Sequence, residues 1–192
     1  FYAEVIAEIK DDVREDQIII TIAPGKTLAW LKEQFGKNVK IVRTMPNTPA
    51  LVGAGMTAAC PNEYMTKEEI AYVLTLLESF GRVEIIPERL MDTVVSVSGS
   101  SPAYVFMFIE AMADAAVSGG MPRAQAYQFA AQAVLGSAKM VLETGKHPGE
   151  LKDMVCSPAG TTIEAVRVLE EKGFRSSVIE AMKTCEEISK SM

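Results

Sequence analysis

The chain has 192 residues, of which 48% are hydrophobic and 23% charged, so it can bury a core and lacks the composition of a disordered segment. Its formal net charge of −6 argues against a nucleic-acid-binding surface, which would carry clustered Lys and Arg. Three widely spaced cysteines and one histidine, His147, offer too few neighbouring ligands for a zinc site. We expect reduced thiols, no metal, a cytoplasmic location and, since no run of about 18 uninterrupted apolar residues occurs, no membrane span.

The first half of the chain alternates helical periodicity with short apolar runs. Helical spacing is expected over residues 1–13, 27–35 and 66–81, and Thr66 followed by Glu69 has the pattern of a capping box. The apolar runs have the pattern of buried strands and lie at residues 17–22, 39–43, 56–60 and 83–86. This alternation predicts an α/β domain over residues 1–87 with a mainly parallel sheet. Because the pattern begins within a crossover, we expect only part of a doubly wound domain.

From residue 88 to 192 the pattern becomes helical throughout, which predicts a second, all-α domain. The expected helices cover residues 88–97, 102–118, 123–143, 148–154, 160–171 and 174–190. The second and third of these are apolar on nearly every side, and a domain of about a hundred residues has little interior to enclose them. We therefore expect a partner subunit to cover these helices. The alternative is a monomeric bundle with a methionine-rich core.

Small and hydroxylated residues lead directly into the helix expected from residue 160. A helix start offers unpaired backbone N–H groups and the positive end of the helix dipole. Together with the hydroxyl groups of Ser157, Thr161 and Thr162, this start could hold a carboxylate or a phosphate. The alternative is an ordinary helix cap with no ligand.

Two further segments could bind a ligand. Residues 98–102, Ser-Gly-Ser-Ser-Pro, predict a tight turn with Ser101 as the helix cap and Pro102 in the first helical turn. Residues 45–49, Met-Pro-Asn-Thr-Pro, follow an expected strand, as do residues 22–25. Ligands of open α/β sheets bind at the carboxyl ends of strands, so a rigid loop with an amide and hydroxyl groups there could contact a nucleotide.

Taken together, these segments resemble the pyrroline-5-carboxylate reductase family, and the resemblance runs from residue 1 to about 190. The motifs that carry it occur in the family's order at residues 45–49, 98–104, 147–153 and 157–163. The family reduces the C=N bond of 1-pyrroline-5-carboxylate to give L-proline, with hydride from NADPH or NADH. The resemblance implies a Rossmann-like NAD(P)-binding domain ending near residue 87. It also implies a helical, substrate-binding dimerisation domain at 88–192, in a homodimer or a larger homo-oligomer.

The resemblance also assigns roles to individual residues. Those expected beside the nicotinamide and its ribose are Ala23, Pro46, Asn47, Thr48, Ser98, Gly99 and Ser100. Those expected to hold the substrate carboxylate are Ser157, Gly160, Thr161 and Thr162, and Thr162 is the candidate for a hydrogen bond to the ring nitrogen. A protonated cyclic imine is already an electrophile, and the cofactor supplies the hydride, so no strong general base is required.

One feature of the family's cofactor site is missing from this sequence. A G-x-G-x-x-G turn should follow the first strand and bind the pyrophosphate, and residues 53–55, Gly-Ala-Gly, lack its spacing. Since the chain begins with Phe1, we expect the start of the nucleotide-binding domain to precede it. Two alternatives to the reductase stay open: a non-catalytic dimerisation or ligand-binding fragment, and a related imine or hydroxy-acid dehydrogenase.

Overall fold

The computed structural model describes residues 1–191, and their contacts divide them into two compact units. The first unit comprises Phe1–Pro102 and the C-terminal segment from Met182 onward, and the second is Ala103–Ala181. The contact-based division falls after Pro102 because Met91 is buried against Ala58 and Cys60 of the sheet. The functional domain boundary expected near residue 87 stays a prediction.

The first unit is built on a four-stranded sheet in the order β1 (Ile18–Thr21), β2 (Lys40–Met45), β3 (Gly55–Pro61) and β4 (Gly81–Ile85). The outer pairs, β1 with β2 and β3 with β4, are parallel, whereas β2 and β3 are antiparallel. The α/β class is therefore confirmed, but the sheet is mixed at its centre. The link from β2 to β3 holds only a short 3-10 helix, η1 (Thr48–Val52), and parallel neighbours need a longer crossover.

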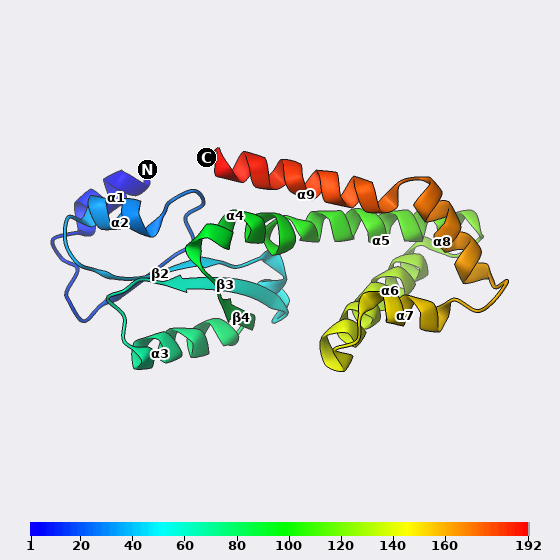
Figure 1. The fold of residues 1–192 in the computed structure, drawn as a ribbon, viewed down its shortest axis with the longest axis horizontal. Coiled ribbons are helices and arrows are strands. Elements are labelled where there is room, and N and C mark those ends of the chain that lie inside the picture. The colour runs from blue at the N-terminus through cyan, green and yellow to red at the C-terminus, as the bar shows by residue number, and fades with distance from the viewer. Residues whose placement is uncertain (192) are drawn as a thin grey trace. The chain divides into compact units, whose positions relative to one another are not determined.

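Helices cover both faces of this sheet (Figure 1). On one face, α1 (Tyr2–Ile9) and α2 (Leu28–Phe35) form a core through Ile6, Leu31 and Phe35 against Ile41. On the other face, α3 (Lys67–Glu78) packs two apolar side chains, at 73 and 77, against β2 and β3. The first helix is shorter than expected, since it ends at Ile9 and residues 10–12 form a turn.

The expected capping box at the start of α3 is present. The Thr66 hydroxyl accepts a hydrogen bond from the Glu69 N–H at 3.2 Å, and the Glu69 carboxylate accepts one from the Thr66 N–H at 2.9 Å. Thr66→Ala should lower the free energy of unfolding by about 1 kcal/mol, because the N–H of Glu69 loses its acceptor. Urea unfolding measures this change, and Thr66→Ser, which keeps the hydroxyl, should retain most of the stability.

A helical stretch follows the sheet, and it differs from the expected turn. It comprises η2 (Glu88–Leu90), α4 (Met91–Val94), the π-helical turn η3 (Val95–Gly99) and α5 (Ser101–Ser118). The tight turn expected at residues 98–102 is therefore wrong. The Ser100 N–H donates to the carbonyl of Val95 at 2.8 Å, so the chain takes one wide helical turn before Pro102 and does not reverse.

The stretch Glu88–Ser118 is long and apolar enough to cross a membrane by length and composition, with a mean hydropathy of 1.2 in its most apolar window. Only 6% of that window is buried within the chain. A helix covered by another protein surface meets the same two criteria, so this measure alone does not identify a membrane span. The absence of a span stays a prediction.

The second unit contains most of α5, the helices α6 (Arg123–Thr144), α7 (Pro148–Val155) and α8 (Thr161–Glu171), and the first part of α9 (Phe174–Lys190). These bounds lie within two residues of the expected ones. Among its described residues, only Ala113, Ala126 and Ala130 are buried hydrophobics. Large apolar side chains of α5 and α6 are exposed instead, namely Val105, Phe106, Met107, Phe108, Tyr127, Phe129, Leu135, Met140, Val141 and Leu142.

Candidate functional site

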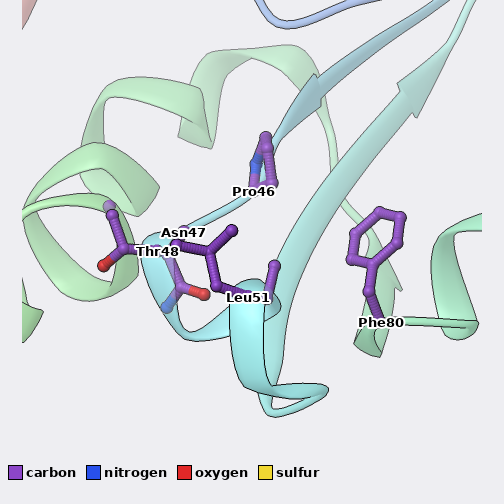
Figure 2. A pocket seen from close by; sticks show the side chains of 7 residues that line it. Pro46, Asn47, Thr48, Leu51 and Phe80 are labelled. Atoms are coloured by element: carbon purple, nitrogen blue, oxygen red, sulfur yellow. The ribbon is translucent and has the colours of Figure 1, made fainter.

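The first unit has a cavity of about 640 Å³ beside the loop that follows β2. Figure 2 shows the side chains that line it, with Pro46, Asn47, Thr48, Leu51 and Phe80 labelled. The complete lining is Pro46, Asn47, Thr48, Ala50, Leu51, Phe80 and Gly99. Four residues predicted from the sequence, Pro46, Asn47, Thr48 and Gly99, thus come together around one cavity at the end of a strand.

The conformation of this loop is fixed by its turn residues and by the side-chain amide of Asn47. Pro49 lies in the first turn of η1, and Gly53 ends it with φ 69°, a left-handed conformation that glycine adopts without strain. The Asn47 Oδ1 accepts a hydrogen bond from the Met56 N–H at 2.9 Å, and its Nδ2 donates to the Ser98 carbonyl at 3.0 Å. Leu51, 90% exposed, stands at the cavity rim.

The other three predicted cofactor residues do not line this cavity. Ala23 is buried, and it borders a separate hollow of about 10 Å³ with Gly25, Met91 and Ser189. The Ser98 hydroxyl donates to the Val94 carbonyl at 3.3 Å, and the Ser100 hydroxyl accepts from the Cys185 thiol at 3.2 Å. Their roles at the cofactor stay predictions.

The four predicted substrate residues lie together in the second unit, at the start of α8. Residues 157–160 form a turn in which the Gly160 N–H donates to the Ser157 carbonyl at 3.0 Å, so this N–H is not free for a ligand. Ala159 has φ 54°, a left-handed conformation that is costly for a residue with a Cβ. The turn is therefore locally strained, as functional turns often are.

Gly160 caps α8 without a side-chain hydrogen bond. A Cβ at this position would lie 2.3 Å from the Ser157 Oγ, so glycine lets that hydroxyl fold over the helix start. The first backbone N–H groups of α8, from Thr161 onward, point out of a helix end with positive partial charge. Thr162 is half-buried, whereas Ser157 and Thr161 are exposed. This arrangement can bind an anionic group such as a carboxylate.

An ion pair in the first unit was not predicted from the sequence. Arg43 of β2 is 8% exposed, and its Nη1 lies 2.9 Å from the Glu88 Oε1, which also accepts a hydrogen bond from the Leu28 N–H at 2.7 Å. The carboxylate thus joins β2 to the start of α2. The sequence offered one signal for this pair, a charged residue within an apolar strand and two positions before Met45.

The described cysteines give no evidence for thiol or metal chemistry. Burial, reinforced by the charge of Glu88, raises the pKa of the Cys60 thiol, so it is a poor nucleophile at neutral pH. All three cysteines are free, with Cys156 and Cys185 half-buried. Over residues 1–191, no group of three His, Cys, Asp or Glu side chains could hold a metal ion.

A Rossmann-like sheet with a cavity where a strand ends, joined to a helical unit, is the architecture of the class of nicotinamide-dependent reductases and dehydrogenases. Residues 88–192 match the family model described as pyrroline-5-carboxylate reductase dimerisation. The chain is 64% identical to the pyrroline-5-carboxylate reductase of Escherichia coli over 98% of its own length and 70% of the relative's. It therefore belongs to the pyrroline-5-carboxylate reductase family.

Other relatives agree with this assignment. An Arabidopsis thaliana pyrroline-5-carboxylate reductase is 41% identical over 98% of this chain and 69% of its own. The solved structure of Plasmodium falciparum pyrroline carboxylate reductase with NADP bound has a TM-score of 0.91 at 34% identity, covering 99% of this chain and 76% of that one. The Coxiella burnetii enzyme gives 0.92 at 34% identity, covering 98% and 71%. Family membership favours the reductase over both alternatives left open by the sequence.

Proposed function

We propose that this protein reduces 1-pyrroline-5-carboxylate to L-proline with hydride from NADPH or NADH, and that its two units hold the two reactants. The observation that carries the residue assignment is the pair of sites just described: an open, mostly apolar cavity at a strand end, and a helix start without a side-chain cap. The first suits a nicotinamide ring, and the second suits a small carboxylate.

The cavity fits the nicotinamide end of the cofactor in size and in chemistry. Its volume of about 640 Å³ lies in the range of small-molecule sites, and its apolar lining includes Pro46, Leu51 and Phe80. Thr48 supplies a hydroxyl group, whereas the amide of Asn47 bonds the Met56 N–H and the Ser98 carbonyl. When bound, the cofactor supplies the hydride, and the side chains around it exclude water and fix its orientation.

The start of α8 holds the substrate in this proposal. The backbone N–H groups of Thr161 and Thr162 donate to the substrate carboxylate, and the Ser157 hydroxyl adds a further donor. The Gly160 N–H is already bonded within the turn, so it is not a donor to the substrate. Gly160 contributes instead by having no side chain. The Thr162 hydroxyl hydrogen-bonds the ring nitrogen, where the proton of the imine resides. Hydride then adds to the imine carbon, and the C=N double bond becomes the C–N single bond of proline.

The helical region makes the protein a homodimer or a larger homo-oligomer. The exposed apolar side chains of α5 and α6 support this assembly, because an isolated soluble unit rarely leaves so many large apolar groups in water. The matched family model describes the same region as the dimerisation part of a reductase. The proposed partners are the substrate and identical subunits, with no nucleic acid and no membrane, and the proposed location is the cytoplasm.

Substrate-dependent oxidation of NADPH and NADH by the full-length protein tests this function. The expected result is loss of nicotinamide absorbance only when 1-pyrroline-5-carboxylate is present, with L-proline formed in equal amount. Sedimentation of the same preparation should show a dimer or larger species at micromolar concentration. No turnover with either cofactor would contradict the enzymatic proposal, and a stable monomer would contradict the assembly.

A further inference from the structure

Asn47 uses both ends of its side-chain amide inside the first unit. Its Oδ1 accepts from the Met56 N–H at 2.9 Å, at the start of β3, and its Nδ2 donates to the Ser98 carbonyl at 3.0 Å, in the π-helical turn. One side chain therefore joins three segments: the loop after β2, the start of β3 and the helix that follows the sheet.

The Ser98 carbonyl needs such a donor because of Pro102. In an uninterrupted α-helix the N–H of residue 102 would donate to the carbonyl of residue 98, but proline has no N–H. The wide turn before it, in which the Ser100 N–H reaches back to Val95, marks the same interruption. Asn47 supplies from another segment the donor that Pro102 lacks.

The same contact brings two walls of the cavity together. Gly99, next to Ser98, approaches β2 so closely that an added Cβ would lie 3.0 Å from the Met45 Cε. Gly99 and Asn47 both line the cavity, one from the π-helical turn and one from the loop. The bond between Asn47 and Ser98 therefore sets the distance between these walls.

We infer that Asn47 is a positioning residue, which locks the π-helical turn onto the loop after β2 and so fixes the geometry of the nicotinamide cavity. The inference rests on the proposed function, and it gives Asn47 a different role from the direct contact with the cofactor ribose that the family resemblance implies. Well-oriented reactants account for a large share of enzymatic rate, and a misplacement of about 1 Å can cost about 100-fold.

Asn47→Asp tests the bond selectively. A carboxylate can still accept from the Met56 N–H, but it cannot donate to the Ser98 carbonyl and repels it. We expect kcat in the full-length enzyme to fall by about 10- to 100-fold, while the Kd for NADP changes by only about 3-fold. Amide hydrogen exchange at Ser100 should also become faster, because its bond lies within the released turn.

Asn62→Asp is the matched control. Asn62 is a buried asparagine that also bridges backbone segments. It donates to the Val39 carbonyl at 2.8 Å and accepts from the Ile41 N–H at 3.2 Å, and it does not line the cavity. Its replacement should lower stability at least as much as Asn47→Asp. We expect the kcat of the folded protein to stay within about 2-fold of wild type and exchange at Ser100 to be unchanged.

Adding Pro102→Ala to Asn47→Asp distinguishes two roles of Asn47. One is to position the π-helical turn against the loop after β2, and the other is only to give the Ser98 carbonyl a donor. The N–H of residue 102 can then donate to the Ser98 carbonyl within the helix, so urea stability should recover while kcat stays low. Recovery of kcat together with stability would overturn the inference, as would an Asn47→Asp enzyme with unchanged kcat and unchanged exchange at Ser100. If the wild-type protein itself does not turn over, the proposed function fails, and hydrogen exchange alone then decides the inference.

Discussion

Thr162→Ala should lower kcat/KM for 1-pyrroline-5-carboxylate by about 100-fold and leave the free energy of unfolding within about 0.5 kcal/mol of wild type. Thr162 is the second residue of α8, after the capping Gly160, and alanine is at least as favourable as threonine inside a helix. The lost hydroxyl is the group proposed to bind the ring nitrogen. Steady-state kinetics and urea unfolding on the same preparation measure both quantities.

Two variants control this experiment. Thr162→Ser keeps the hydroxyl and should retain activity within about 10-fold, whereas Thr75→Ala removes a hydroxyl that only bonds the Ala71 carbonyl within α3 and should leave kinetics unchanged. A Thr162→Ala enzyme with wild-type kcat/KM would remove Thr162 from the mechanism. A loss of kcat/KM accompanied by a comparable loss in the free energy of unfolding would show that Thr162 has only a structural role.

Of the substitutions proposed for this protein, Glu88→Ala should lower the free energy of unfolding most, by about 3 kcal/mol. The substitution leaves the buried Arg43 guanidinium without its carboxylate, and it removes the acceptor of the Leu28 N–H at the start of α2. Breaking a buried ion pair by removing one partner costs this much because an uncompensated charge stays in the interior. Urea unfolding with a probe of the first unit, such as Trp30 fluorescence, measures the change.

A surface pair provides the control for Glu88. Glu143 lies 3.5 Å from Lys139 on α6, with both side chains mostly exposed, so Glu143→Ala should change stability by at most about 0.5 kcal/mol. Adding Arg43→Met to Glu88→Ala removes the stranded charge and should restore part of the loss. A Glu88→Ala protein as stable as wild type would show that the pair does not hold β2 and α2 together.

Local signals in the sequence predicted most of the secondary structure. The Thr66 and Glu69 pattern placed the start of α3, and Gly36, with φ 65°, ends α2 directly after the helix expected over residues 27–35. These features depend on residues only a few positions apart. Periodicity and capping therefore determine them without knowledge of the tertiary structure.

Features that depend on distant residues were not predictable in the same way. The antiparallel pairing of β2 with β3 follows from a short link that sequence periodicity does not reveal. Residues 98–102 were predicted to form a tight turn, whereas residues 95–99 form a wide helical turn that leads into the next helix. The pairing of Arg43 with Glu88 joins residues 45 positions apart, so only the fold shows it.

In the candidate site, too, local motifs were predictable from the sequence and contacts between distant residues were not. The motif at residues 45–49 predicted a ligand-binding loop at the end of a strand, and this loop lines a cavity that Gly99 of the later motif also borders. Ala23, which the family resemblance also placed beside the nicotinamide ribose, lies in a separate small hollow. The bond from Asn47 to the Ser98 carbonyl could not be predicted, because it replaces a helical hydrogen bond whose loss becomes visible only once the helix is known to continue through residue 98.

Transfer of deuterium from the cofactor to the product tests the central claim most directly. The full-length protein would be supplied with 1-pyrroline-5-carboxylate and NADPH carrying deuterium at both C4 positions, and the product analysed by mass spectrometry and NMR. The proposed reaction predicts L-proline with one deuterium at Cδ, the former imine carbon. Unlabelled proline, or label at any other carbon, would contradict hydride transfer from the cofactor to the imine.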